Sequence, residues 1–370
     1  MAVRQSAMEK MVGDTAAALH HAFSGRSIFI TGHTGFKGSW LTLWLARMGA
    51  RVAGYALPPD TQPSLFELAH IENVLERHVL ADVRDFAQLQ SAMHASAPEI
   101  VFHLAAQPLV RKGFREPLET WSTNVMGTVN VLEAARSCPG IKAVVVVTTD
   151  KCYKNLEQVH SGYREEDVLG GSDPYSGSKA AAELVVASYR KSFFSDGKLL
   201  LASARAGNVI GGGDWCEDRL IPDMARAAAK GQTIQIRNPL ATRPWQHVLA
   251  ALHGYLLLAS NLIEGRAEFA DAFNFGPGAH DNLSVESVLT QMKAFWPELA
   301  WEFDKPAASA QHEAQLLFLD SSKARKMLDW SPKWELSTGL EKTAEWYQAV
   351  ARQPAQARAI TELQLTQYCS

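Results

Sequence analysis

The sequence is poor in cysteine, and its cysteines do not fall at the spacings of a metal or redox motif. Four are present among 370 residues, widely separated and without a Cys-x-x-Cys pair: Cys138, Cys152, Cys216 and Cys369. This pattern excludes a cysteine-built zinc site and a disulfide framework, and it is typical of a reducing compartment. We therefore predict a cytoplasmic protein without a metal centre.

An excess of charge of one sign and a long hydrophobic run are also absent. The 36 Lys and Arg residues against 39 Asp and Glu give a net charge of -3, so no surface for nucleic acid or an anionic membrane is predicted. No apolar run reaches the roughly 20 residues that cross a bilayer. The stretch up to about Ser24 includes Glu9 and Asp14 and lacks the apolar segment of a signal peptide. We interpret residues 1–24 as an extension outside the catalytic unit.

The first half of the sequence alternates apolar strand segments with helix-length segments. The predicted strands span residues 27–31, 51–56, 78–82, 99–104, 142–148 and 199–204. Continuous apolar strands that alternate with helices indicate a parallel sheet covered on both faces. The predicted fold class is α/β, a Rossmann-type doubly wound parallel sheet in residues 25–206. After residue 206, glycine and proline residues separate shorter elements. This pattern predicts a smaller C-terminal α/β lobe in residues 207–370, with some segments returning to the sheet.

A glycine-rich loop follows the first predicted strand and leads into a helix predicted from Ser39 to Met48. The loop reads Gly-His-Thr-Gly-Phe-Lys-Gly over residues 32–38. Glycine lets the backbone turn tightly and approach a pyrophosphate, whose charge the helix N-terminus stabilises. A tight turn without a ligand is the alternative, but a strand–loop–helix context favours dinucleotide binding. The predicted contacts are Gly32, His33, Gly35, Phe36 and Gly38.

Further cofactor contacts are predicted where the third and fourth strands end. Asp82 and Val83 follow the third strand, a usual place for an adenine contact. Small residues after the fourth strand allow a cofactor to approach, although close helix packing would also explain them: Leu104, Ala105, Ala106 and Gln107. The second strand ends at Tyr55-Ala-Leu57 without an acidic residue or a following arginine, so this position leaves NAD and NADP both open.

Tyr175 and Lys179 lie four residues apart, on one face of a predicted helix. An ammonium group near a phenol, together with a nicotinamide cation, favours the phenolate and lowers the tyrosine pKa. Such a phenolate can take a proton from an alcohol while hydride leaves the same carbon. Because Tyr-x-x-x-Lys is a short motif, a surface helix pair is the alternative interpretation.

A glycine loop followed by Thr149, Tyr175 and Lys179 in that order resembles the short-chain dehydrogenase/reductase superfamily. With Asn124 on the preceding helix, the resemblance covers nearly all of residues 26–210. It implies that Thr149, Tyr175 and Lys179 are catalytic. It also implies a nicotinamide dinucleotide beside Asn124, Tyr175 and Lys179, and a homodimer built on the helices that carry Asn124 and Tyr175.

Three segments of the second half resemble the extended branch of this superfamily, which acts on nucleotide diphosphate sugars. They are residues 205–215, 218–222 and 243–248. The resemblance implies substrate contacts from Asn208, Arg219, Leu220, Arg243 and His247. An arginine suits a diphosphate because its planar fork donates two hydrogen bonds to phosphate oxygens. Surface ion pairs are the alternative role for these arginines.

Asp150 and Lys151 follow Thr149, and sugar-nucleotide 4,6-dehydratases carry an acid at the first of these positions. Most of them have glutamate at the second, where this sequence has lysine. Asp150-Lys151, the glycine loop and the Gly-Gly-Gly-Asp-Trp segment at 211–215 together resemble the 4,6-dehydratases that act on CDP-glucose. The resemblance implies NAD as cofactor, Asp150 as the acid for the C6 hydroxyl and Lys151 at the C5 step. It further implies deoxysugar synthesis for a surface polysaccharide such as lipopolysaccharide O-antigen.

Three other functions stay open on the sequence. A nucleotide-sugar 4-epimerase needs Tyr175 and Lys179 but no acid for elimination, so Asp150 distinguishes the two reactions. A 4,6-dehydratase for another nucleotide hexose would carry the same catalytic set. An inactive cofactor-sensing protein is disfavoured, because such proteins commonly lose one of the catalytic residues.

Overall fold

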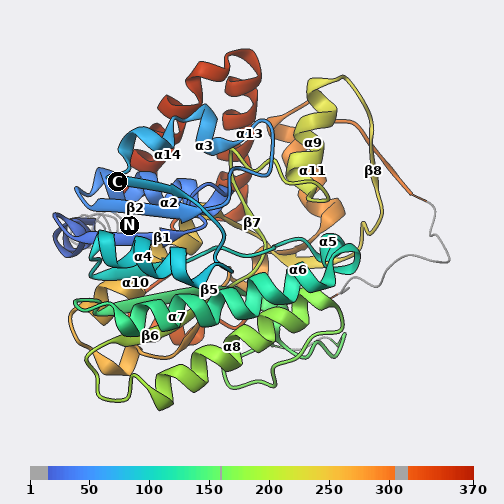
Figure 1. Ribbon diagram of the computed structural model, residues 1–370. Coiled ribbons are helices and arrows are strands. Elements are labelled where there is room, and N and C mark those ends of the chain that lie inside the picture. Colours follow the sequence, from blue (N-terminus) through green and yellow to red (C-terminus); the bar gives the residue numbers. More distant parts are fainter. Residues whose placement is uncertain (1–15, 159–160, 305–315) are drawn as a thin grey trace, which may run out of the picture.

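The computed structural model describes residues 16–158, 161–304 and 316–370 (Figure 1). Its centre is a seven-stranded sheet in the order β11-β6-β5-β4-β1-β2-β3, and all neighbouring strands are parallel. The strands are β1 (Ser27–Thr31), β2 (Arg51–Ala56), β3 (Arg77–Leu80), β4 (Ile100–His103), β5 (Ala143–Thr149), β6 (Leu200–Ala206) and β11 (Ala272–Phe275). This order confirms the predicted Rossmann-type doubly wound fold.

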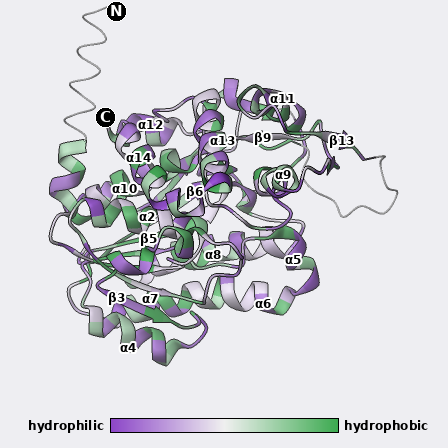
Figure 2. Cartoon of the chain, turned by 90° about the horizontal axis from the view of Figure 1, so that it is seen from above, coloured by the Kyte–Doolittle hydropathy of each residue, from purple (hydrophilic) through white to green (hydrophobic). Residues whose placement is uncertain are grey.

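Helices cover both faces of the sheet. One face carries α4 (Phe86–Ser96), α7 (Gly127–Ser137) and α8 (Pro174–Ser192), and the other carries α2 (Phe36–Arg47), α10 (Val248–Ile263) and α12 (Ser322–Leu328). Side chains alternate along β5, so that Val144 and Val146 face the first layer while Val145 and Val147 face the second. Figure 2 shows the hydrophobic colour along the strands. Burial on both faces explains why these strands read as continuous apolar runs.

The strand predictions agree with the structure to within two residues, but the first helix begins earlier than predicted. Helix α2 starts at Phe36, three residues before Ser39, because the backbone turns helical within the glycine loop itself. It ends at Arg47, and Gly49 follows with a φ of 78°, the left-handed conformation in which glycine terminates helices.

The second half of the chain builds smaller elements over the carboxyl ends of the strands. Three two-stranded sheets pair β7 (Val209–Ile210) with β10 (Gln246–His247), β9 (Thr242–Pro244) with β12 (Asn282–Ser284), and β8 (Ile234–Ile236) with β13 (Trp301–Phe303). The α-helices are α9 (Leu220–Ala229), α11 (Val285–Phe295), α13 (Leu336–Arg352) and α14 (Ala357–Cys369). In Figure 1, α9 and α11 lie together on the side of the molecule away from α4. Strand β11 belongs to this half of the sequence and pairs with β6 in the main sheet.

Shorter elements connect these parts. They are α3 (Leu65–Leu68), α5 (Val110–Arg115), α6 (Pro117–Trp121), a π-helical turn η2 (Ser122–Met126), and the 3₁₀ turns η1 (Ile71–Val74), η3 (Asp150–Cys152), η4 (Ala267–Phe269), η5 (Ala279–Asp281) and η6 (Pro354–Gln356). Of the predicted N-terminal extension, residues 1–15 lie outside the described residues, whereas residues 16–23 are helical and bury Leu19 and Phe23 in the core. Within the described residues, no helix has the length and hydrophobicity to span a membrane.

Candidate active site

A cleft of about 500 Å³ lies at the carboxyl ends of the strands, the edge at which doubly wound sheets bind ligands. The glycine loop, the ends of β3, β4 and β5, and second-lobe segments around residues 206–223 and 234–245 form its wall. The predicted site residues that line it are Gly32, Gly35, Phe36, Gly38, Asp82, Val83, Leu104, Ala105, Ala106, Thr149, Asp150, Lys151, Tyr175, Lys179, Asn208, Arg219, Leu220 and Arg243. The fold thus brings together segments that are far apart in the sequence.

The glycine loop has no room for side chains at two of its three glycines. Gly32 has a φ of 79°, and a Cβ there would lie 2.6 Å from the backbone nitrogen of Ala105. A Cβ on Gly38 would overlap the carbonyl oxygen of Gly32, whereas one on Gly35 would meet that oxygen only at 3.5 Å. Gly35 is the N-cap of α2, whose first turn contains no acidic residue, and no described side chain caps this end. The helix N-terminus is therefore open toward the cleft, as pyrophosphate binding requires.

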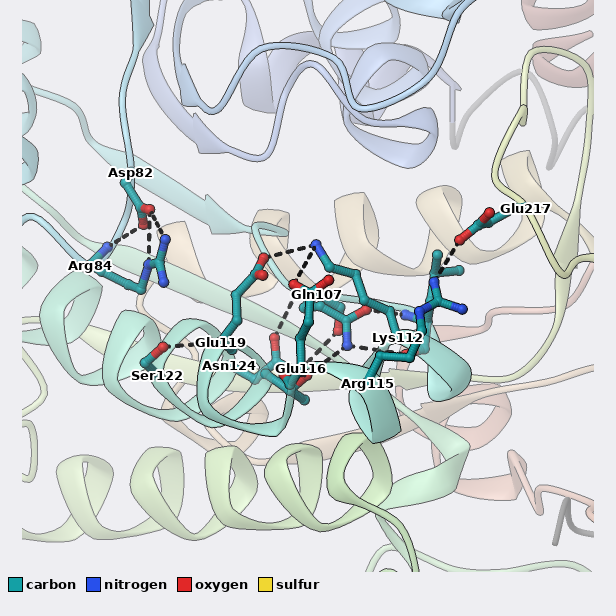
Figure 3. Close-up of polar contacts among 12 residues, drawn as sticks. Asp82, Arg84, Gln107, Lys112, Arg115, Glu116, Glu119, Ser122, Asn124 and Glu217 are labelled. Carbon is teal, nitrogen blue, oxygen red and sulfur yellow. Dashed lines mark hydrogen bonds and ion pairs between the residues drawn. The ribbon is translucent and has the colours of Figure 1, made fainter. Parts of the chain in front are cut away.

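Asp82 and Val83 follow β3, line the cleft and are held by neighbouring polar groups. Figure 3 shows the contacts between Asp82 and Arg84. Arg84 donates to the Asp82 carboxylate from its backbone nitrogen at 2.8 Å and from Nε at 2.9 Å. These hydrogen bonds lower the pKa of Asp82 below its usual range. The Tyr55 hydroxyl donates to the Asp82 carbonyl at 2.9 Å, and the Asn130 amide donates to the Val83 carbonyl at the same distance. The residues predicted to contact adenine are thus held by hydrogen bonds to three neighbouring residues.

Gln107 and Asn124 lie behind the cleft wall and shape it (Figure 3). The Gln107 backbone nitrogen donates to Asn124 Oδ1 at 2.8 Å. Asn124 Nδ2 donates to the Gln107 carbonyl at 3.1 Å and to Ser178 Oγ at 2.9 Å. These bonds tie the loop after β4 to α8, so the two residues support the segment that lines the cleft.

His33 and His247 are also predicted site residues that lie outside the cleft wall. The His33 ring is fully buried beside His78, with ring centroids 4.9 Å apart, and burial lowers its pKa to about 3. His247 caps α10 by accepting from the Leu249 backbone nitrogen, and its ring packs against Trp334 with centroids 4.9 Å apart. Both histidines therefore pack in the protein interior next to the elements that build the site.

Tyr175, Thr149 and Lys179 meet in the cleft at the end of β5 and the start of α8. Lys179 is buried, its Nζ donates to the Val147 carbonyl at 3.3 Å, and burial lowers its pKa to about 8. Burial raises the pKa of Tyr175 to about 12, and hydrogen bonding with Thr149 opposes this rise. The sequence predicted a lowered tyrosine pKa. In the protein without a cofactor the pKa is raised instead, because burial outweighs the hydrogen bond with Thr149 and the charge of Arg219.

Asp150 is the most deeply buried carboxyl group of the site, with 1% of its surface exposed. Its Oδ1 accepts from the Thr149 hydroxyl at 2.9 Å, and its Oδ2 has no hydrogen-bond partner among the described residues. Burial raises the pKa of Asp150, although the nearby charges of Lys151, Arg243 and Lys37 act in the opposite direction. The net shift of the pKa is upward, in the direction that a proton donor requires.

Arginines from both lobes meet across the cleft. Arg219 Nη1 pairs with Asp214 at 2.9 Å, and Arg243 is buried with Nη1 donating to the Thr242 carbonyl at 2.8 Å. Farther along, Asp218 pairs with Arg111 of α5 at 3.0 Å. Guanidinium groups suit a diphosphate, although Arg219 and Arg111 are each paired with an aspartate here.

Several charged residues that line the cleft were not predicted as site residues: Lys37, Asp60, Arg111, Asp214, Asp218, Asp223 and Arg237. Lys37 occupies a non-glycine position of the glycine loop, and its Nζ lies 3.5 Å from the Tyr255 hydroxyl. Burial, with the charges of Arg219 and Lys179, lowers its pKa to about 7. Asp60 lies four residues beyond β2, too far along for a search limited to the strand end. Lys37 could have been predicted, because a cationic side chain in a loop that approaches phosphate is well placed to bind it.

Similar proteins share both the fold and the family. Among solved structures, an epimerase from Methanothermobacter thermautotrophicus superposes with a TM-score of 0.79 at 23% identity, covering 94% of this chain and 98% of the other. A dTDP-glucose 4,6-dehydratase from Bacillus anthracis, solved in complex with NAD, gives 0.73 at 22% identity, covering 88% and 97%. These likenesses establish the fold. The sequence profile described as GDP-mannose 4,6-dehydratase matches residues 29–343. The chain belongs to the GDP-mannose 4,6-dehydratase family.

Within the GDP-mannose 4,6-dehydratase family, the chain is much more similar to one kind of relative than to others. It is 49% identical over 336 residues to a CDP-glucose 4,6-dehydratase from Salmonella typhimurium, covering 89% of this chain and 92% of the relative. A profile that spans residues 29–343 includes both the Rossmann-type sheet and most of the second lobe. The resemblance predicted from the motifs is thereby confirmed at the level of the family.

Proposed function

We propose that the protein dehydrates CDP-glucose to CDP-4-keto-6-deoxyglucose. The observation that carries this proposal is the buried acid Asp150 beside Thr149, in the same cleft as Tyr175 and Lys179. Oxidation at C4 requires only a base and a hydride acceptor, but elimination of water also requires an acid for the departing hydroxyl. The 49% identity to a CDP-glucose 4,6-dehydratase supports the choice of nucleotide.

The residues of the cleft fit NAD as the cofactor. The tight glycine loop and the uncapped N-terminus of α2 suit its pyrophosphate, and Asp82 and Val83 lie where its adenine would bind. When bound, NAD supplies a hydride acceptor for C4 and afterwards a hydride donor for C6. Leu104, Ala105 and Ala106 would lie along it, with Lys179 at its nicotinamide ribose.

Tyr175 is the proposed base that takes the proton of the C4 hydroxyl, and Thr149 hydrogen-bonds to the same hydroxyl. The hydrogen bond between Thr149 and Tyr175, which both line the cleft, supports a shared contact with that hydroxyl. Lys179 follows one turn after Tyr175 on α8, where its ammonium favours the phenolate. General base catalysis of this kind typically contributes 10²–10⁴ in rate.

Asp150 is the proposed acid for the C6 hydroxyl, and Lys151 the group that handles the C5 proton. The ketone at C4 acidifies C5, so removal of that proton and protonation of the C6 hydroxyl together eliminate water. Lys151 Nζ lies 6.0 Å from the centroid of the Tyr175 ring. It therefore shares the face of the cleft at which C4 would react, and either a neutral amine or a charged one that stabilises the enolate fits this place.

The sugar nucleotide is proposed to bind between the lobes. Arg219 and Arg243 would hold the diphosphate, and Asn208 lines the same cleft. Leu220, the first residue of α9, would contact the nucleoside. His247 was predicted as a further contact, and it would act through the packing of α10 because it lies behind the wall.

We infer that the protein works as a homodimer in the cytoplasm. Helices α6 and α8 contact each other, and large apolar side chains on them and on η2 are exposed: Leu118 at 86%, Met126 at 51% and Leu184 at 60%. Such a group of exposed apolar residues is typical of an interface with another subunit.

The cytoplasmic location is supported by cysteine usage, because cysteines without paired spacings suit a reducing compartment.

A panel of nucleotide sugars tests the proposed function. Purified protein with NAD is incubated with CDP-, dTDP-, UDP- and GDP-glucose, and the products are identified by NMR. The proposal expects a 4-keto-6-deoxy product, formed fastest from CDP-glucose. A 4-epimerase would instead return the corresponding galactose nucleotide, and that result would refute the dehydratase assignment.

A further inference from the structure

Glu183 and Arg205 form a buried ion pair beneath the catalytic residues. Arg205 Nη2 lies 2.8 Å from Glu183 Oε2, and only 5% and 2% of the two side chains are exposed. Glu183 follows Lys179 by four residues on α8, so the carboxylate lies one helical turn below the ammonium on the same face. A buried charge pair is costly to maintain for stability alone, and its place under Lys179 points to another role.

Glu183 joins α8 to the neighbouring strands β5 and β6. Its Oε1 accepts from the Thr148 hydroxyl at 2.5 Å, and its Oε2 accepts from the Ser203 hydroxyl at 2.8 Å. Thr148 directly precedes Thr149 on β5. The carboxylate therefore fixes α8 against the end of β5, where the proposed catalytic groups of both elements must meet.

Arg205 extends this network to the turn that carries Asp150 and Lys151. Its Nη1 donates to the Tyr153 hydroxyl at 2.8 Å, and Tyr153 directly follows η3. The Tyr153 hydroxyl in turn donates to Asn274 of β11 at 2.7 Å. One ion pair thus connects α8, β5, β6, β11 and the η3 turn.

The charge on Lys179 depends on the groups packed around it. Burial lowers its pKa, while the negative charge of Glu183, and a weaker influence of Cys152 in η3, raise it. Lys179 also acts electrostatically on His103 of β4 and Lys37 of α2, and burial lowers the pKa of both. A neutral His103 and a Lys37 with a pKa of about 7 offer Lys179 no negative charge. The Glu183 carboxylate is accordingly the main group that favours the ammonium form of Lys179.

We propose that Glu183 is a positioning residue that keeps Lys179 charged and α8 in register with β5, while Arg205 keeps the Glu183 carboxylate ionised. The proposal rests on the proposed function in one respect, that Lys179 must be an ammonium to favour the Tyr175 phenolate. Loss of the Glu183 charge should therefore remove activity first at the alkaline side of the pH profile, where Lys179 deprotonates.

The pH dependence of kcat with CDP-glucose tests the proposal in the full-length protein. Glu183→Gln should move the alkaline limb to lower pH by about one unit or more, the scale of a neighbouring opposite charge. Ser203→Ala removes a hydrogen bond to Glu183 and keeps its charge, so its alkaline limb should stay at the wild-type pH. An unshifted limb in Glu183→Gln, or an equal shift in Ser203→Ala, would overturn the proposal.

Glu183→Gln leaves Arg205 buried without its counter-ion, so misfolding could also lower the activity of this variant. A second variant distinguishes misfolding from the loss of the Glu183 charge. Glu183→Gln combined with Arg205→Met removes both charges, an exchange that proteins often tolerate. This double variant should fold and show the same lowered limb. Failure to fold would count against the proposal, since the pair would then be a structural requirement.

Direct titration of Lys179 separates this proposal from the proposed function. Lysines labelled with ¹³C at Cε are followed by NMR in wild type and in Glu183→Gln, and the Lys179→Met spectrum identifies the signal. Lys179 should titrate at lower pH in Glu183→Gln. If the wild-type protein converts no nucleotide sugar, the proposed function fails, yet this shift still decides the role of Glu183. Identical titration in both proteins would refute it.

Discussion

Replacing Asp150 by asparagine removes an acid and preserves the shape of the site. The amide oxygen can still accept from the Thr149 hydroxyl, which now bonds to Oδ1 at 2.9 Å. The amide nitrogen would take the place of Oδ2, in a space so limited that a Cβ on Gly207 would lie 3.1 Å from that oxygen. The two side chains have nearly the same size, so the substitution tests proton donation and little else.

The size of the effect follows from the environment of Asp150. Burial raises its pKa, which favours proton donation to the departing C6 hydroxyl, and asparagine has no acidic proton to deliver. Loss of a general acid typically lowers the rate by 10²–10⁴, which corresponds to about 3–5 kcal/mol of barrier. Oxidation at C4 does not need this acid. Exchange of the C5 proton with deuterated solvent should therefore persist in Asp150→Asn, while release of the 4-keto-6-deoxy product slows.

NMR measures both quantities in one sample, since product formation and deuterium incorporation at C5 give separate signals. Asp173→Asn is a matched control, because Asp173 caps α8 through the Ser176 backbone nitrogen at 3.0 Å and asparagine caps helices about equally well. The control should retain activity. A wild-type rate of product formation in Asp150→Asn would refute the assignment of the acid, and it would favour an epimerase or another proton donor.

Three further predictions concern the C5 step, the glycine loop and the subunit interface. Lys151→Met should abolish C5 exchange and Lys151→Glu should restore it, whereas exchange at the wild-type rate in both would remove Lys151 from this step. Gly38→Ala should lower the free energy of unfolding by about 1–3 kcal/mol and weaken dinucleotide binding, because its methyl group would overlap a loop carbonyl oxygen. Gly35→Ala, whose methyl group has only an ordinary contact at 3.5 Å, should denature thermally like wild type. Leu118→Glu and Leu184→Glu should convert a dimer into monomers in sedimentation velocity, and an unchanged dimer would contradict the interface.

The sheet could be predicted from sequence because its strands are buried on both faces. Runs such as Val144–Val147 are apolar without interruption, and that pattern is characteristic of central parallel strands. The short strands of the second lobe, some only two residues long such as β7 (Val209–Ile210), lack a pattern of that length. Their pairing depends on which distant segments meet, and periodicity carries no information about that.

The candidate site was predicted best where chemistry and local geometry coincide. Tyr175 and Lys179 lie on one helix face, so their spacing determines that they share the cleft wall. His33 lies within the glycine motif, yet its ring points into a pocket beside Gly54, where a Cβ would come within 2.5 Å of it. Side-chain direction in a loop depends on the neighbouring strand and not on the motif. Lys37 is at another non-glycine position of the motif. It was overlooked because the motif does not determine the direction of its side chain, which lines the cleft.

Transfer of a label within one substrate molecule tests the proposed dehydration most directly. CDP-glucose with deuterium at C4 is mixed with an equal amount of CDP-glucose that carries ¹³C throughout the sugar and no deuterium, and the products are analysed by mass spectrometry and NMR. We predict that deuterium appears at C6 of the molecules that carried it at C4, with no net accumulation of reduced cofactor. Deuterium lost to solvent, transferred to the ¹³C-labelled molecules or returned to C4 would contradict an internal dehydration.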